Sequence, residues 1–107
     1  MTVVSTAVPG QVIIDGGSKA FAADPYQGSE PPFGHVLEAP EAHFTRMSEE
    51  HGFVNIERVK DRLTIGQRLR VIPNHICPAV NLHENLYAVR GEDVVDVWPV
   101  KDRGRLQ

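Results

Sequence analysis

The chain has 107 residues, of which 41% are hydrophobic and 23% charged, and its formal net charge is −3 at pH 7. This is typical of one globular domain, and the negative charge with scattered arginines provides no basic surface for nucleic acid. No apolar run approaches the ~20 residues that span a bilayer, no secretion signal precedes the first strand, and one cysteine excludes an internal disulfide, so we expect a cytoplasmic protein with no membrane partner.

Short β-like runs separated by glycine and proline dominate the chain. Such runs predict strands, and the turn residues between them predict a turn at Pro9-Gly10 and hairpins at residues 49–52 and 90–93. The expected strands cover residues 2–7, 11–15, 34–38, 42–48, 53–57, 67–73, 86–89 and 94–98. Many short strands at close spacing predict a mainly β fold for residues 1–107, as a single small barrel or sandwich-like domain with short helical turns.

The segments between these strands carry weaker signals. Residues 22–32 contain several prolines and a glycine, which predicts an exposed loop. Helical periodicity is weak everywhere, so we expect only one or two turns over residues 57–63 and another after Pro78. The polar tail over residues 101–107 is expected to fray.

The only cysteine, Cys77, lies two residues after His75 at the end of an apolar run. In an extended strand, residues i and i+2 point to the same face, so the imidazole and the thiolate would converge. This pair of donors suits zinc, and two protein ligands leave positions open for water or substrate, as in a catalytic site. Taken alone, the pair is also compatible with a small buried cysteine and a hydrogen-bonded histidine.

Other polar residues have functional and structural interpretations side by side. Glu50 and His51 lie at a predicted hairpin tip, where they could act as an acid–base pair or, as we favour slightly, form a solvated turn. Lys19 follows Gly16-Gly17, and we expect it to close a turn against Asp15 rather than to hold an aldehyde cofactor. The two glycines lack the rest of a phosphate-binding fingerprint.

The end of the chain adds two further interpretations. Trp98 is predicted to anchor a core or an interface, and Asp93 and Asp96 to keep the last hairpin soluble. His75, Cys77, Glu84 and Gly91 also faintly resemble a cupin-like metal site, with His83 as an extra candidate. However, six residues separate Cys77 from Glu84, which is too many for that motif.

Four blocks of sequence, taken together, are more specific than any one motif. They cover residues 12–20, 48–52, 73–81 and 94–100. In this order they closely resemble the carboxy-terminal β-domain of the D-serine dehydratase and D-threonine aldolase family, over nearly the whole chain. The resemblance implies a domain that works with an alanine-racemase-like (β/α) barrel, where pyridoxal phosphate is held on a lysine.

The resemblance also implies a divalent metal, zinc in the dehydratases, near the β-hydroxyl of a D-hydroxyamino-acid substrate. Carried over, its ligands are His75 and Cys77. Cysteine at the second position is similar to the dehydratases, whereas the aldolases commonly have aspartate there and use other divalent ions. The metal could assist loss of the hydroxyl in dehydration or its deprotonation in aldol cleavage. The expected function is thus a metal-binding domain of a D-amino-acid lyase.

The chain departs from the family in having no barrel, no cofactor-binding residue and only three lysines, Lys19, Lys60 and Lys101. None of these matches the family's cofactor lysine, so we expect no activity from the chain alone. It would be a fragment of a longer enzyme, which we favour, one half of a split enzyme, or a stand-alone metal- or small-ligand-binding β-barrel module, cupin-like in role. Strands that normally meet a barrel would be open, so a homo-oligomer is expected.

Overall fold

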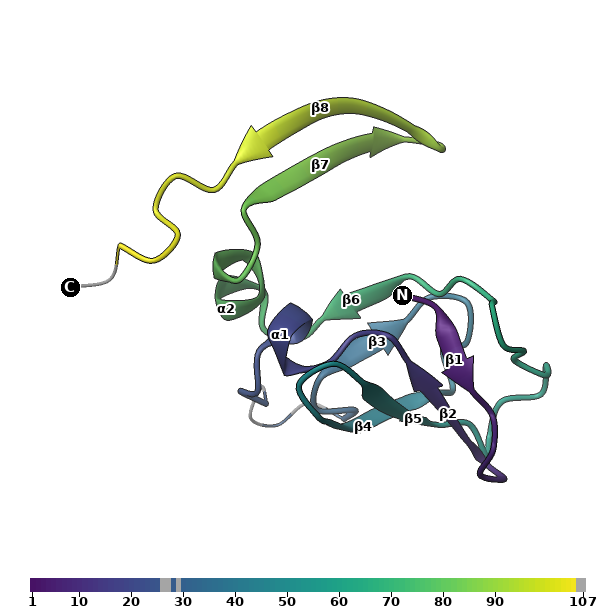
Figure 1. Cartoon of the computed structure of the whole chain (residues 1–107). Coiled ribbons are helices and arrows are strands. Elements are labelled where there is room, and N and C mark those ends of the chain that lie inside the picture. Colours follow the sequence, from purple (N-terminus) through teal and green to yellow (C-terminus); the bar gives the residue numbers. More distant parts are fainter. Residues whose placement is uncertain (26–27, 29, 106–107) are drawn as a thin grey trace.

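The computed structural model describes residues 1–25, 28 and 30–105. Its largest sheet contains β1 (Val3–Ser5), β2 (Gln11–Ile14), β4 (His43–Met47) and β5 (Gly52–Asn55), in the antiparallel order β1-β2-β5-β4. A second sheet pairs β3 (Gly34–Val36) with β6 (Val71–Pro73). The mainly β, sandwich-like prediction is therefore confirmed, and the described residues do not form a closed barrel (Figure 1).

Period-two alternation explains which side chains form the core. Val12 and Ile14 are fully buried while Gln11 and Ile13 are half-buried, as expected for one face of a sheet turned inward. Phe44 of β4 is buried between two other rings, with Phe21 edge-on at 5.3 Å and Phe33 tilted at 5.8 Å between centroids. Aromatic packing thus joins the large sheet to the segments that precede β3.

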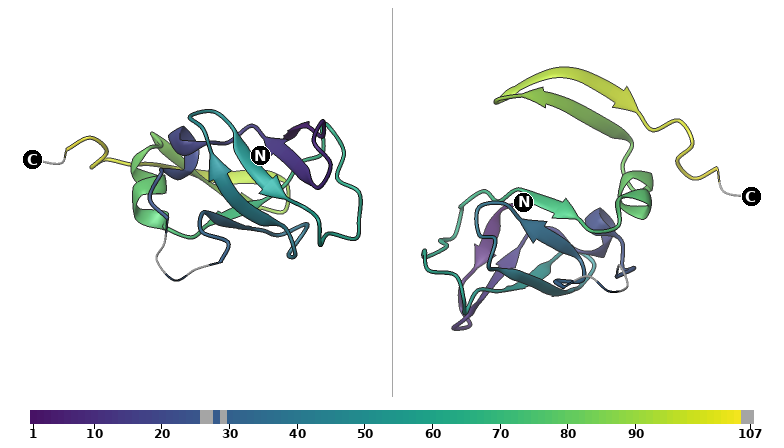
Figure 2. Two further views of the ribbon diagram at one scale, coloured as in Figure 1. Left: turned by 90° about the horizontal axis from the view of Figure 1, so that it is seen from below. Right: turned by 180° about the vertical axis from the view of Figure 1, so that it is seen from behind.

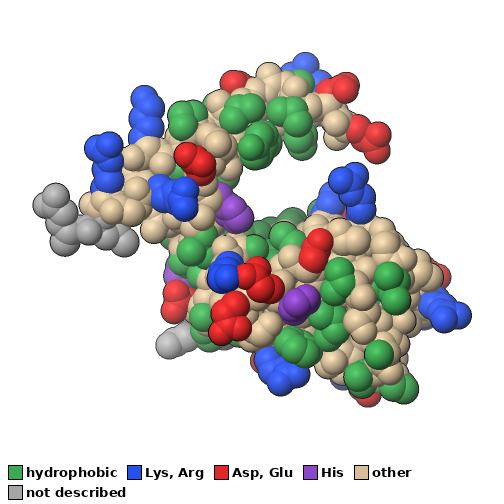
Figure 3. All heavy atoms as spheres, in the orientation of Figure 1, with side chains coloured by type: hydrophobic (Ala, Val, Ile, Leu, Met, Phe, Trp, Pro, Cys, Tyr) green, Lys and Arg blue, Asp and Glu red, His purple; other side chains and the backbone are tan. Residues whose placement is uncertain are grey.

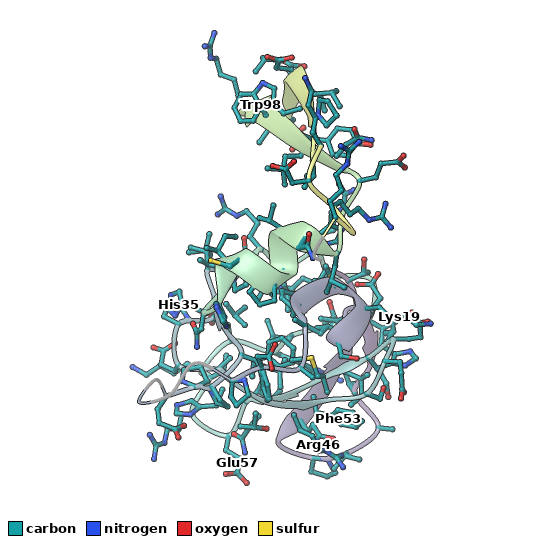
Figure 4. The ribbon with its side chains drawn as sticks, turned by 90° about the vertical axis from the view of Figure 1, so that its left-hand side faces the viewer. Lys19, His35, Arg46, Phe53, Glu57 and Trp98 are labelled. Atoms are coloured by element: carbon teal, nitrogen blue, oxygen red, sulfur yellow. The ribbon has the colours of Figure 1, made fainter. Side chains whose placement is uncertain are left out.

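The outer strands of the large sheet carry solvent-exposed contacts. In β4, Arg46 faces Phe53 of β5, and its guanidinium lies 4.0 Å from the centre of the phenylalanine ring (Figure 4). Such a cation–π contact at an exposed position adds a modest stabilisation to the pairing of two strands. The predicted turn at Pro9-Gly10 and the predicted hairpin at residues 49–52 are both confirmed.

Two short helices lie against each other at one end of the sheets (Figure 1). Helix α1 (Ser18–Phe21) was not expected from the sequence. Helix α2 (Ile76–Asn81) begins before Pro78 rather than after it, because a proline in the first helical turn removes only an N–H that has no intrahelical partner. The helical turns expected over residues 57–63 were wrong: this segment forms bends and turns.

The predicted strand over residues 67–73 is shorter than expected. Only Val71–Pro73 pairs with β3, and Arg68 forms an isolated bridge with Thr2. The described residues of the loop over 22–32 form no strand or helix and are mostly exposed, as predicted, although residues 26, 27 and 29 lie outside the described part. The expectation for the tail concerns in part residues 106–107, which also lie outside it.

The last hairpin stands apart from the rest of the molecule. Strands β7 (Asn85–Arg90) and β8 (Asp93–Pro99) pair as predicted, and we refer to residues 85–99 as the arm and to residues 1–73 as the body. Figures 1 and 2 show that the arm projects from α2 and arches over the body without a second layer beneath it. Every residue of β8 is exposed, so the core belongs to the body.

Among the described residues, no helix is long and apolar enough to cross a membrane.

Candidate functional site

The His75-Cys77 pair lies at a junction between a strand and a helix, and not on a strand as the sequence suggested. Strand β6 ends at Pro73, His75 occupies the N-cap position with extended backbone angles (φ −119°, ψ 92°), and Cys77 is the second residue of α2. The premise that i and i+2 share a strand face was therefore wrong. The fixed φ of Pro78 is already suited to a first helical turn, which favours the helix at this point.

Asn74 holds this junction against the body. Its backbone N–H donates to the carbonyl oxygen of Phe33 over 3.2 Å, and its side-chain amide donates to the carbonyl oxygen of Pro31. Because Phe33 packs on Phe44, the loop that precedes β3 connects the junction to the buried core. These two hydrogen bonds thus fix the backbone just before the candidate ligands to the body.

The donor types present at the junction are those of a divalent metal site. Cys77 is a free, exposed thiol, and His75 is half-buried beside it in the chain. An imidazole nitrogen and a thiolate sulfur form a borderline-soft set that zinc prefers. Within the described part of the chain, no group of three or more His, Cys, Asp or Glu side chains could hold a metal, so the remaining ligands would come from outside these residues.

The cupin-like alternative does not fit this geometry. Glu84 is exposed beyond the end of α2, and Gly91 lies at the tip of the arm with φ +65°. Neither residue joins His75 and Cys77 in a metal-binding group among the described residues. The ring of His83, the extra candidate, places Nε2 3.1 Å from the carbonyl oxygen of Ala20, which links the end of α2 to α1 when that nitrogen carries the proton.

An apolar hollow of about 400 Å³ adjoins the junction, and we refer to it as the hollow. Both helices, β6 and the start of β7 contribute to its walls, which include Phe21, Val71, Pro73, Ile76, Ala79 and Leu86. Ile76, which separates His75 from Cys77, is thus a wall residue. A group that enters the hollow would lie next to the candidate metal ligands in an environment that disfavours water.

The turn that carries Glu50 and His51 is solvated, and Glu50 has a different partner from the one considered above. Its carboxylate forms an exposed ion pair with the ammonium group of Lys19. This hydrogen bond, followed by the negative charge of Glu50, raises the pKa of Lys19. The expected contact of Lys19 with Asp15 was wrong, because the Asp15 carboxylate instead accepts the N–H of Thr2 at 2.6 Å. A catalytic role for Glu50 and His51 stays a prediction.

Gly16-Gly17 serves a close backbone contact rather than a phosphate. The N–H groups of Ser18 and Lys19 donate to the carbonyl oxygens of Ser48 and Glu49, over 2.8 and 3.1 Å. A Cβ atom at Gly17 would lie 2.2 Å from the carbonyl oxygen of Ser48, so only glycine fits. The first amides of α1 are therefore used within the protein and are not available to bind a phosphate.

Asp96 and Trp98 interact in a way that sequence reasoning missed. The carboxylate of Asp96 accepts the backbone N–H of Val97 at 2.8 Å and the indole N–H of Trp98 at 2.7 Å. The indole itself is 54% exposed, so Trp98 is not part of the core of this chain. Figure 4 shows it on the arm, far from the labelled residues of the body. The spacing of i and i+2 on one strand face was the signal for this pair.

These features define a class of protein: a mainly β domain in which an exposed cysteine and a nearby histidine lie beside an apolar hollow. The family described as "Putative serine dehydratase domain" matches residues 1–89. The chain belongs to this family, and it corresponds to the carboxy-terminal β-domain of the D-serine dehydratases and D-threonine aldolases.

Curated relatives fall into two size classes. A D-threonine aldolase of Arthrobacter sp. is 36% identical over 103 residues, which are 96% of this chain and 26% of the aldolase. A 3-hydroxy-D-aspartate aldolase of Paracoccus denitrificans is 35% identical over 97% of this chain and 25% of its own. An uncharacterized protein of Mycobacterium tuberculosis is 32% identical over 98% of this chain and 84% of its own. This chain therefore spans about a quarter of the aldolases.

Solved structures agree with this assignment. A D-threonine aldolase from Filomicrobium marinum superposes with a TM-score of 0.79 at 27% identity, over 99% of this chain and 28% of its own. The D-threo-3-hydroxyaspartate dehydratase from Delftia sp. HT23 superposes with a TM-score of 0.75 at 26% identity, over 92% of this chain and 30% of its own. Mutants of that dehydratase have alanine in place of a histidine or of the cysteine two positions later, and the cysteine mutant is described in the metal-free form.

Proposed function

We propose that this chain is the metal-binding carboxy-terminal domain of a pyridoxal-phosphate-dependent D-amino-acid lyase of the D-serine dehydratase or D-threonine aldolase type. The observation that carries the proposal is the His75-x-Cys77 spacing. The same residue types at the same spacing were replaced in the Delftia dehydratase, and that enzyme superposes on this chain. Cys77 at the second position favours dehydration over aldol cleavage, by resemblance to the dehydratases.

The roles of this chain's residues follow from the junction. The imidazole of His75 and the thiolate of Cys77 would hold a divalent ion, zinc being the best match for the donor set. When bound, such an ion supplies Lewis acidity toward the β-hydroxyl of a D-hydroxyamino acid. The apolar wall that includes Ile76 would limit water beside the bound group, which strengthens electrostatic interactions there.

The cofactor half of the reaction would be supplied by a barrel, in the same polypeptide or in another. Pyridoxal phosphate needs a lysine that is activated by burial or by a neighbouring cation. Lys19, Lys60 and Lys101 are all exposed, and Lys19 is paired with Glu50. We therefore expect turnover of D-hydroxyamino acids only when a cofactor-bearing barrel is present, because the electron sink belongs to the cofactor.

A second function is favoured by one specific observation. The mycobacterial relative is matched over 84% of its length, against about a quarter for the aldolases, so it is much closer to this chain in size. Proteins of this size could bind a metal or a small ligand without an attached barrel. This alternative makes the same prediction for metal and the opposite one for lyase activity in the presence of a barrel.

Cobalt titration tests the metal site directly. A Co²⁺–thiolate bond gives a charge-transfer absorption that requires Cys77, because the chain has no other cysteine. We expect the band in the wild-type chain, its loss in Cys77→Ser, and a Kd at least 10-fold weaker in His75→Ala. Zinc should displace the cobalt and remove the band.

His83→Ala is the matched control, because His83 is exposed and lies at the other end of α2. Its cobalt affinity should equal that of the wild type. Equal affinity for His75→Ala and His83→Ala, or cobalt binding that persists without Cys77, would contradict the assignment of the site.

A further inference from the structure

The arm is an apolar element without cover. Its large hydrophobic side chains are largely exposed, with 62% for Tyr87, 63% for Val89 and 54% for Trp98. A two-stranded hairpin is at best marginally stable in water unless a third strand or a packed layer supports it. Among the described residues of the body, no layer lies under the middle of the arm (Figures 1 and 3). A layer that packs on the arm would therefore have to come from outside the described residues.

Both faces of the arm carry large apolar side chains. Leu86 pairs with Trp98, and the adjacent pair, Tyr87 with Val97, points to the opposite face because side chains alternate along strands. Strands that are hydrophobic on both faces are typical of sheets buried on both sides. Leu86 also lines the hollow, so the Leu86–Trp98 face continues the apolar walls of the hollow toward the tip. Figure 3 shows hydrophobic side chains on the side of the arm that faces the body.

The Leu86–Trp98 face also carries a charged residue, Asp96, which protects the edge of β8. Asp96 lies in the middle of this strand and its carboxylate accepts the N–H groups of Val97 and of the Trp98 indole. A charged residue in the middle of an open strand disfavours the addition of a further strand. A partner would therefore contact the apolar faces rather than extend the sheet at β8.

The comparison with longer enzymes indicates what occupies this surface. The superposition with the Filomicrobium D-threonine aldolase covers 99% of this chain, so it includes the arm, yet it covers only 28% of the aldolase. The remaining, larger part of that enzyme could therefore pack against the hairpin that corresponds to the arm. Helix α2 carries Cys77 at its start and leads into the arm at its end. A segment seated under the arm would lie next to the candidate metal ligands.

We propose that the arm and the hollow form one clamp for an apolar segment of the cofactor-bearing portion of the lyase, so that docking places His75 and Cys77 at that interface. This inference rests on the proposed function, because it takes the cofactor-bearing portion as the occupant. It assigns the arm a docking role and explains why both of its faces carry large apolar side chains that the chain itself leaves largely exposed.

Hydrogen–deuterium exchange of two proteins tests the clamp. One is the 107-residue chain, and the other is a chimera in which this chain replaces the matching carboxy-terminal residues of the Arthrobacter D-threonine aldolase. In the free chain, peptides from residues 85–99 should exchange much faster than those from residues 52–55. In the chimera, exchange over residues 85–99 should slow by at least about 10-fold, since sub-global opening then requires undocking.

Lysine variants separate docking from folding. Trp98→Lys, on the face of the arm that continues the hollow, should abolish the added protection of residues 85–99 in the chimera. The matched control is Val4→Lys, because Val4 is also an exposed hydrophobic residue of a strand, at 41% against 54% for Trp98, but belongs to the body. Both variants should leave the unfolding midpoint of the free chain unchanged, and Val4→Lys should retain the protection.

Each other outcome overturns the inference. If the arm of the free monomer exchanges as slowly as β5, the arm is stable without a partner. If its protection rises with protein concentration and sedimentation shows a dimer, a second copy of the chain covers the arm instead of the cofactor-bearing portion. An unprotected arm in a chimera with normal exchange over residues 52–55 excludes the clamp. Zinc analysis of the same chimera distinguishes the two proposals: protection without zinc contradicts the metal site alone, and zinc without protection contradicts the clamp alone.

Discussion

Individual carboxylates fix parts of the body that are distant in sequence. Asp15 accepts the N–H of Thr2 and donates its own N–H to the carbonyl of Thr2, which aligns β1 with the end of β2. Partial burial acts to raise the pKa of Asp15, but hydrogen bonds from Thr2 and the nearby charge of the amino terminus outweigh it, so the pKa is lowered. Burial likewise acts against Glu38, whose pKa is lowered overall by its hydrogen bonds with Arg70.

Acid should therefore destabilise the body in part through Asp15. A carboxylate with a lowered folded pKa stabilises the protein above its unfolded pKa of about 4, and this stabilisation disappears as the pH falls through the folded value. We expect Asp15→Asn to flatten the fall in unfolding free energy between about pH 5 and pH 3, by less than about 1 kcal/mol because the group is mostly exposed. Urea midpoints over this range measure the effect. Parallel pH profiles for variant and wild type would exclude it, while the effect of Glu38 remains in both.

At the scale of elements, α1 depends on a contact that local sequence does not reveal. A helix of four residues is too short to be stable alone, because the entropy lost in fixing the first turn exceeds the stabilisation from its hydrogen bonds. Its first N–H groups instead bond to the turn between β4 and β5, about thirty residues away, and Gly17 permits that approach. The same docking buries Phe21 against Phe44. Position 17 thus controls the fit between a helix and a hairpin.

Replacing Gly17 by alanine should destabilise the protein by about 1–3 kcal/mol, the usual range for overpacking, because the new Cβ meets backbone that cannot move aside easily. Gly66→Ala is the control: Gly66 has φ +87° with open space around it, so only the strain of the left-handed conformation is added, about 1–2 kcal/mol. Thermal or urea unfolding should report the two losses, with α1 amides losing exchange protection only in Gly17→Ala. Retained protection there would argue against the docking role.

At the scale of the whole molecule, stability and function are divided between two regions. The buried hydrophobic cluster lies between Val3 and Leu69, all within the body. The arm contributes no buried residue, and α2 connects the two regions and carries the candidate ligands. The body therefore acts as the folded support, and the junction and the arm present the surfaces that a partner would use.

Removal of residues 84–107 should leave the unfolding free energy of the body within about 1 kcal/mol of the full chain, because little apolar area is lost from its core. Urea unfolding followed by far-ultraviolet circular dichroism measures this difference. A truncated chain that no longer unfolds cooperatively would show that the arm supports the body after all.

Local chemistry in the sequence by itself determined most of the strands, the turn at Pro9-Gly10, the two later hairpins, the His75-x-Cys77 motif and the family, since alternation and turn residues act over a few positions. Only the tertiary structure decided that His75 and Cys77 lie at a strand–helix junction, that α1 exists, and that Lys19 meets Glu50 rather than Asp15. These features depend on contacts between distant segments. The arm shows the same limit, because apolar strands have the same sequence pattern whether their cover lies within the chain or in a partner.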